Sequence, residues 1–127
     1  MNKPIRWFSF HNHDGSLWKV QQSSHEISPD LRGKENTRGL DGLMDPEHKL
    51  ITLDAAAKRS VQDYITLHEV MHAALDGVDG ICSTAEEAII TAMAPRLYPI
   101  LHKFGLNWPD RPEEFVALER KARRNSK

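Results

Sequence analysis

Residues 67–75 read LHEVMHAAL, and they place two histidines four positions apart around a glutamate. Residues four apart lie on one face of an α-helix, with Cβ atoms about 5–6 Å apart, so His68 and His72 can bind the same ion. Zinc takes imidazole nitrogens as ligands at about 2.0–2.1 Å. Glu69 would lie beside such a metal, where its carboxylate can serve as the general base of a hydrolase. The pattern therefore predicts a helix that carries two zinc ligands and a base.

The sequence around this motif also favours a helix. Ser60 with Asp63 three residues later is typical of a helix start, and Gly77 is typical of a helix end, so we expect a helix from residue 60 to about 76. The two histidines border its apolar stripe rather than its solvent face. The alternative is an ordinary amphipathic helix, because a chain with 7 histidines matches the pattern by chance with a probability on the order of a few per cent.

A zinc site of this kind needs a third protein ligand and leaves a fourth position for water. The sequence after His72, AALDGVDGICST, contains no further histidine, so the next helix must supply a carboxylate. That helix begins with STAEEAII, in which Glu86 and Glu87 are both available. Each glutamate could also close a capping box, with Ser83 or with Thr84, and only one box can form. The residues alone leave Glu86 and Glu87 as alternatives for the third ligand.

The remaining segments predict a small α+β protein. Residues 5–10 and 17–21 read as the strands of a β-hairpin, with Asp14-Gly15 at its turn. Residues 22–47 predict a long loop with room for an irregular strand or a short helix, and the alternating sequence HKLITLD at 48–54 predicts a third strand. We expect these strands to form a small antiparallel sheet that packs on the helix of the HExxH motif and on the glutamate-bearing helix.

The C-terminal part predicts two further helices. The glutamate-bearing helix contains Pro95 and Pro99, which predict a kink or a break and restart. The sequence DRPE at 110–113 opens a terminal helix over 111–127 that ends in the basic tail KARRNSK. With 127 residues, the chain fits a single domain over 1–127.

The composition and the net charge limit the binding partners and the cellular compartment that we expect. A formal net charge of -1 predicts no general affinity for nucleic acids or membranes, and no apolar run is long enough to span a bilayer. Cys82 is the only cysteine, which agrees with a reducing compartment. We expect a soluble cytoplasmic protein whose partner is a protein or peptide, without a role for nucleic acid; the sequence predicts no oligomeric state.

HEVMH followed by EEAIITAMAP resembles the gluzincin type of zincin peptidases. More narrowly, the chain resembles small phage and prophage metallopeptidases related to the ImmA/IrrE family. The resemblance covers residues 38–105, through LITLD, TLHEVMHAAL and EEAIITAMAP, and of these only HExxH is individually diagnostic. In those relatives the third ligand opens a helix as Glu-Ala before apolar and small residues, and Glu87-Ala88 fits this pattern better than Glu86 does.

The resemblance implies a zincin-like fold in which His68, His72 and Glu87 hold Zn²⁺ and Glu69 is the catalytic base. It implies a zinc-dependent metallopeptidase that hydrolyses peptide bonds of a protein substrate through a metal-activated water. We expect an edge strand at residues 48–53 to bind the extended substrate by strand addition. The alternative is a phage regulatory or inhibitory binding protein on a zincin scaffold, with structural zinc or none.

Overall fold

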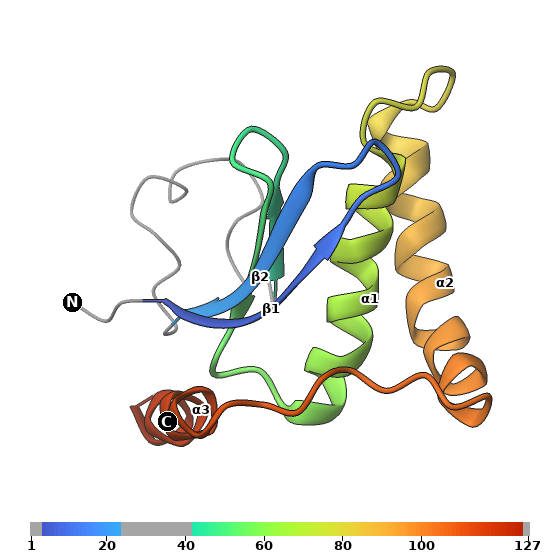
Figure 1. The fold of residues 1–127 in the computed structure, drawn as a ribbon. Coiled ribbons are helices and arrows are strands. Elements are labelled where there is room, and N and C mark those ends of the chain that lie inside the picture. Colours follow the sequence, from blue (N-terminus) through green and yellow to red (C-terminus); the bar gives the residue numbers. More distant parts are fainter. Residues whose placement is uncertain (1–3, 24–41, 126–127) are drawn as a thin grey trace.

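The computed structural model describes residues 4–23 and 42–125 of the chain. Within these ranges the protein is a small α+β structure with a mixed sheet of four strands and three helices (Figure 1). None of the described helices has both the length and the apolar composition that a membrane crossing needs. The elements follow in the order β1 (Ile5–His11), β2 (Leu17–Ser23), β3 (Gly42–Asp45), β4 (Leu50–Asp54), α1 (Arg59–Leu75), α2 (Ser83–Lys103) and α3 (Glu113–Asn125).

The sheet has the strand order β1-β2-β4-β3. The pairs β1–β2 and β3–β4 are antiparallel, as each is joined by a short turn, but β2 and β4 run parallel. The prediction of an antiparallel sheet is therefore wrong for the central pair. A short connection forces two neighbouring strands to run antiparallel, whereas the long segment between β2 and β4 permits a parallel pairing.

The predicted hairpin is confirmed, and its turn is built as expected. Gly15 has a φ of 86°, a left-handed conformation that glycine adopts without a steric penalty. The Asp14 carboxylate accepts a hydrogen bond of 2.9 Å from the backbone N–H of Ser16, which tightens the turn. β4 is also confirmed, although it begins at Leu50 rather than at His48.

β3 lies inside the segment that we predicted as a long loop. Its four residues, GLMD, are too short and too poor in β-branched side chains to predict a strand by themselves. They form one because they pair with β4, from Gly42 opposite Leu53 to Asp45 opposite Leu50. This pairing also corrects a second prediction: residues 48–53 do not form an edge strand, because β4 is bonded to β2 on one side and to β3 on the other.

α1 and α2 form an antiparallel pair of helices. α1 begins at Arg59 after the N-cap residue Lys58, which makes no side-chain capping bond, so Ser60 is not the cap that we predicted. α2 is a single helix, so the predicted break and restart at Pro95 and Pro99 is wrong, whereas a kink at these prolines stays a prediction. Proline removes a backbone hydrogen bond from a helix, yet α2, which packs on α1, continues through both prolines.

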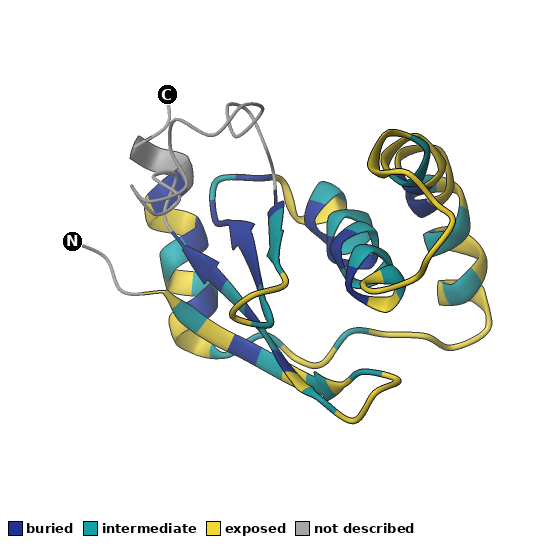
Figure 2. Cartoon of the chain, turned by 90° about the horizontal axis from the view of Figure 1, so that it is seen from above, coloured by how far each residue is buried: buried dark blue, intermediate teal, exposed yellow. Residues whose placement is uncertain are grey.

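The elements are stacked in layers beside the sheet. α1 contacts β3 and β4, α2 contacts α1, and α3 contacts β1. The sheet thus packs on α1, and the prediction that it also packs on the glutamate-bearing helix is wrong, because α1 lies between them (Figure 2). Figure 2 shows α1 between the sheet and α2, and most of the outer surface of α2 is exposed. Ala73 of α1, one residue after His72, is completely buried, so the motif is anchored directly on the sheet. The buried apolar cluster comprises Trp7, Trp18, Val20, Ile51, Leu53, Ala73 and Phe115.

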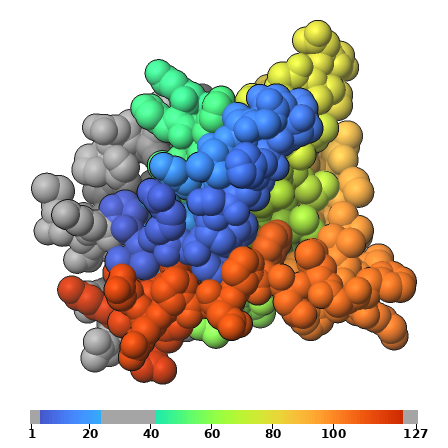
Figure 3. All heavy atoms as spheres, viewed as in Figure 1, coloured from blue at the N-terminus to red at the C-terminus, as the bar shows by residue number. Residues whose placement is uncertain are grey.

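The segment between α2 and α3 returns across the molecule to the first strand (Figure 3). Trp108 donates a hydrogen bond of 2.9 Å to the backbone carbonyl of Asp63, and Arg111 forms a 2.8 Å ion pair with the Asp63 carboxylate. Trp7 donates a bond of 2.9 Å to the carbonyl of Pro109. The terminal helix begins at Glu113 rather than at residue 111, and the carbonyl of Pro112 accepts a 3.1 Å bond from the N–H of Val116 at its start.

Candidate metal centre

His68 and His72 lie one turn apart on α1, on the side that faces α2. Their ring centroids are 5.0 Å apart, which agrees with the spacing expected for helix positions four apart. Both side chains are mostly buried, with exposures of 12% and 13%. The hairpin turn holds the end of this motif, because Asn12 donates a 2.8 Å hydrogen bond to the carbonyl of Ala73. The packing therefore fixes the backbone from which both imidazoles project.

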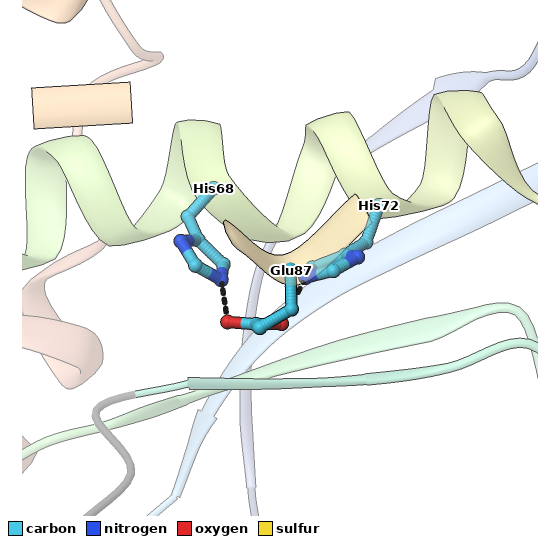
Figure 4. A group of neighbouring side chains, drawn as sticks. All are labelled: His68, His72 and Glu87. Carbon is cyan, nitrogen blue, oxygen red and sulfur yellow. Dashed lines mark hydrogen bonds and ion pairs between the residues drawn. The ribbon is translucent and has the colours of Figure 1, made fainter. Parts of the chain in front are cut away.

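Glu87, in the first turns of α2, reaches both histidines (Figure 4). Its Oε1 lies 3.1 Å from Nε2 of His68, and its Oε2 lies 2.7 Å from Nε2 of His72. Thr91 donates a 3.1 Å hydrogen bond to Oε1 and so orients the carboxylate from the next turn of the helix. One ligand atom from each of the three residues lies within 4.8 Å of the others. Tetrahedral zinc separates its ligands by roughly 3.3 Å, so this donor set fits the ion after small side-chain adjustments.

The surroundings of His72 also fit a cation. Its Nδ1 lies 2.6 Å from Oε2 of Glu86, and its Nε2 lies 2.7 Å from Oε2 of Glu87. A neutral imidazole has only one N–H, so a neutral His72 cannot donate to both carboxylates. The second nitrogen is satisfied if an additional proton is present, on the ring or on a carboxylate, or if a metal ion binds there. His68 and Glu87 lie on the Nε2 side of His72, whereas only Glu86 lies at Nδ1, so a metal ion would find its candidate ligands on the Nε2 side.

The structure separates the two glutamates that the sequence left as alternatives. Glu87 lies against both Nε2 atoms, whereas Glu86 contacts His72 at Nδ1. Neither of the predicted capping boxes forms. The N-cap of α2 is Cys82, whose Sγ accepts a bond of 3.4 Å from the N–H of Ala85. Sequence reasoning missed this cap because cysteine is not among the usual N-cap residues.

Glu69 lies between the two histidines in sequence but outside the group of ligand atoms. Its Oε2 is 4.0 Å from Nε2 of His68, which is close to the metal position without belonging to it. Burial raises the pKa of Glu69 to about 7, against the opposing effect of the nearby His72. A carboxyl group with a pKa near neutrality is matched to accepting and returning a proton at physiological pH.

β3 forms the wall beside Glu69. A Cβ atom at Gly42 would lie 3.3 Å from Cγ of Glu69 and 2.8 Å from Cγ2 of Ile65. Glycine is therefore required for the close approach of β3 to α1 at the candidate base. Sequence reasoning missed this role of Gly42. A glycine within a strand often marks a close approach of two backbones, but this signal needs β3 to be known first.

The two imidazoles have different electrostatic surroundings. Burial lowers the pKa of His68, and the nearby His72 adds to this effect, so that the neutral ring is favoured despite Glu87. Burial also acts to lower the pKa of His72, but the hydrogen bond to Glu86 and the charges of Glu69 and Glu87 outweigh it and raise the pKa. The additional carboxylate at Nδ1 accounts for the difference between the two histidines.

A second group of metal-binding residue types occurs in the turn between β3 and β4, at Asp45, Glu47 and His48. The Asp45 carboxylate already accepts hydrogen bonds from the backbone N–H of Glu47, at 3.0 Å, and from Nδ1 of His48, at 2.8 Å. These bonds are those of an aspartate that closes a turn. The group is thus explained by the turn itself.

Comparisons of the chain with protein-family models, with curated proteins and with solved structures found no match.

Proposed function

We propose that the protein is a zinc-dependent metallopeptidase of the zincin type. His68, His72 and Glu87 would hold the ion, and Glu69 would be the general base. One observation carries the proposal: the Nε2 atoms of both histidines meet the Glu87 carboxylate at 3.1 and 2.7 Å, while Glu69 lies buried beside them and outside the ligand group. Three ligands with an adjacent carboxylate are the composition of a catalytic zinc site.

In the proposed hydrolysis, the zinc ion and Glu69 have separate roles. When bound, zinc supplies Lewis acidity and makes water a nucleophile near neutral pH. Glu69 takes a proton from the attacking water and then delivers it to the leaving amine, so that one carboxyl group serves both halves of the reaction. Its burial strengthens this role, because a desolvated carboxylate binds a proton more readily than an exposed one.

β3 is the strand that best suits an extended substrate. Among the described strands, its only neighbour is β4, whereas β4 itself is paired on both sides. A peptide that adds to the sheet beside β3 would form backbone hydrogen bonds along a strand that starts at Gly42, directly against Glu69. This arrangement supports a protein or peptide substrate, with the scissile bond brought near the candidate base. It replaces residues 48–53 as the expected place of strand addition.

The exposed side of α2 supports a second candidate function, that of a phage regulatory or inhibitory binding protein on a zincin scaffold. Ile89, Met93, Ile100 and Phe104 are exposed, Phe104 by 84%, and their spacing of 4, 7 and 4 residues puts them on one side of the helix by its period. Contiguous exposed apolar side chains often mark a site of protein interaction. In this alternative the centre holds structural zinc or none, and peptide hydrolysis is not required.

The test combines a measurement of zinc content with a substitution of Glu69, the proposed base. Protein purified without a metal-affinity tag should contain about one zinc per chain, measured by elemental analysis. Glu69→Gln has nearly the same size and should keep the zinc while lowering the hydrolysis rate by about 10²–10⁴-fold. Glu114→Gln, an exposed glutamate in α3, is the matched control and should retain full activity.

Activity is measured by co-expressing each form with candidate host and phage proteins and identifying fragments by mass spectrometry. Fragments that appear with the wild type and with Glu114→Gln, but not with Glu69→Gln, would support the peptidase. A wild-type protein that takes up no metal would refute the proposal. If Glu69→Gln keeps its zinc and has the same cellular effect as the wild type, the binding function should replace catalysis.

A further inference from the structure

The two ring nitrogens of His72 meet different glutamates of the same helix. Nε2 faces Glu87, and Nδ1 lies 2.6 Å from Oε2 of Glu86. Among the described residues, no comparable bond is formed at Nδ1 of His68. The two candidate zinc ligands therefore differ in their second nitrogen, and only one of them is held by a carboxylate.

We propose that Glu86 is a positioning residue for His72: it accepts the Nδ1–H of the imidazole and thereby directs the Nε2 lone pair at the metal. The inference rests on the proposed function, since it assigns a role around the same zinc centre. Metal-binding histidines commonly donate their other ring N–H to a carboxylate or a carbonyl, which fixes the tautomer and the ring orientation. Glu86 would not touch the ion or the substrate.

The helix geometry explains how consecutive residues take different roles. Neighbouring positions on an α-helix point about 100° apart, so Glu86 and Glu87 approach His72 from two directions. The Glu86 side chain has an exposure of 21%, whereas that of Glu87 has 56%. Glu86 is thus packed at the contact between α1 and α2, while Glu87 faces the more open side, where a ligand and a water can be exchanged.

The bond between Glu86 and His72 has two consequences for metal binding. It stops the imidazole from rotating about its Cβ–Cγ bond, which would move Nε2 away from Glu87 and from His68. It also places the ring proton on Nδ1, so that Nε2 is free as a ligand. Without the bond, both the orientation and the tautomer of His72 must be selected when the metal binds, and the affinity falls.

An acidic residue in the first turn of a helix also stabilises the helix through its dipole, and this purely structural effect must be separated from positioning. Glu86 and Glu113 are both acidic residues in a first helical turn, of α2 and of α3 respectively. Glu113→Ala is therefore the matched control for Glu86→Ala. Glu86→Gln tests the hydrogen bond more finely, because an amide oxygen can still accept the Nδ1–H although it carries no charge.

The experiment measures zinc affinity by competition with a chelator for the wild type and the three variants, after circular dichroism has verified the helical content. We expect Glu86→Ala to weaken zinc binding by about 10–100-fold, Glu86→Gln to weaken it less, and Glu113→Ala to leave it unchanged. In the zinc-loaded protein, nitrogen-15 NMR should show that the Nδ1 proton of His72 exchanges faster with water in Glu86→Ala. The Nδ1 proton of His68 should not change.

The outcomes separate the positioning role from the function on which it rests. If the wild type binds zinc and Glu86→Ala binds it equally well, or loses no more affinity than Glu113→Ala, the positioning role is refuted and the zinc site stands. Unchanged exchange at Nδ1 of His72 would refute it in the same way. A wild type that binds no zinc would overturn the proposed function and this inference together.

Discussion

Gly42→Ala adds one methyl group at the contact between β3 and α1. The new Cβ would lie 2.8 Å from Cγ2 of Ile65 and 3.4 Å from Cδ2 of Leu53, where ordinary contact begins at about 3.4 Å. Cγ2 is attached directly to the Cβ of Ile65, and β-branched side chains in helices have one strongly preferred χ1 rotamer. The overlap therefore cannot be relieved by moving the end of a flexible side chain, and β3 must shift away from α1.

Overpacking of this kind typically costs about 1–3 kcal/mol of stability. For a chain of this length, each kcal/mol lowers the melting temperature by roughly 4 °C, so we expect Gly42→Ala to melt roughly 4–12 °C below the wild type. The same methyl group would lie 3.3 Å from Cγ of Glu69, which is tight but can be relieved by a small shift. We expect the shift of β3 to lower the proposed peptidase activity together with the stability, while the proposed zinc site, which has no ligand on β3, keeps its metal.

A double-mutant cycle with Ile65→Ala identifies the overlap as the cause. Ile65→Ala removes Cγ2 and should destabilise the protein by itself, but in its presence Gly42→Ala should cost at least about 1 kcal/mol less than in the wild type. Stability is measured by urea unfolding at constant temperature. Additive losses in the cycle, or a Gly42→Ala variant as stable as the wild type, would refute the packing argument.

Two further predictions test other parts of the structure. Pro99→Ala restores a backbone N–H to the continuous helix α2. We expect it to raise the free energy of unfolding in urea by on the order of 1–3 kcal/mol. An unchanged or lower stability would contradict a continuous helix at this position. The hydrogen bond and the negative charge of Asp45 raise the pKa of His48 in the folded protein. The pair therefore stabilises the fold fully at a pH below the unfolded pKa of histidine. Its contribution is lost as the pH rises through the folded pKa. NMR titration should find this raised pKa in the wild type and a return toward the ordinary value in Asp45→Asn; equal pKa values in the two proteins would exclude the pair.

The sequence by itself determined the features that depend on local geometry. The HExxH spacing puts His68 and His72 on one face because an α-helix has 3.6 residues per turn, whatever surrounds it. The turn at Gly15 and the helix end before Gly77 were predictable because both glycines adopt positive φ values, 86° and 83°, that other residues avoid. Each of these predictions needed only the conformational preferences of a few consecutive residues.

Where local preference was weak or misleading, long-range contacts decided the structure. β3 has little strand propensity and exists because it pairs with β4. α2 packs on α1 and continues through Pro95 and Pro99 against a local preference for a break. In both segments the free energy of packing and pairing exceeds the intrinsic preference of the backbone. That free energy depends on residues far away in the sequence, so the segment alone does not predict it.

The division of roles between Glu86 and Glu87 also required the tertiary structure. In the sequence both glutamates open the same helix, and either could reach a metal or cap the N-terminus. The rotation of α2 about its own axis, set by its packing on α1, brings Glu87 to the Nε2 atoms of His68 and His72 and brings Glu86 to Nδ1 of His72. A helical period determines which residues share a face, but only the contact with another helix determines where that face points.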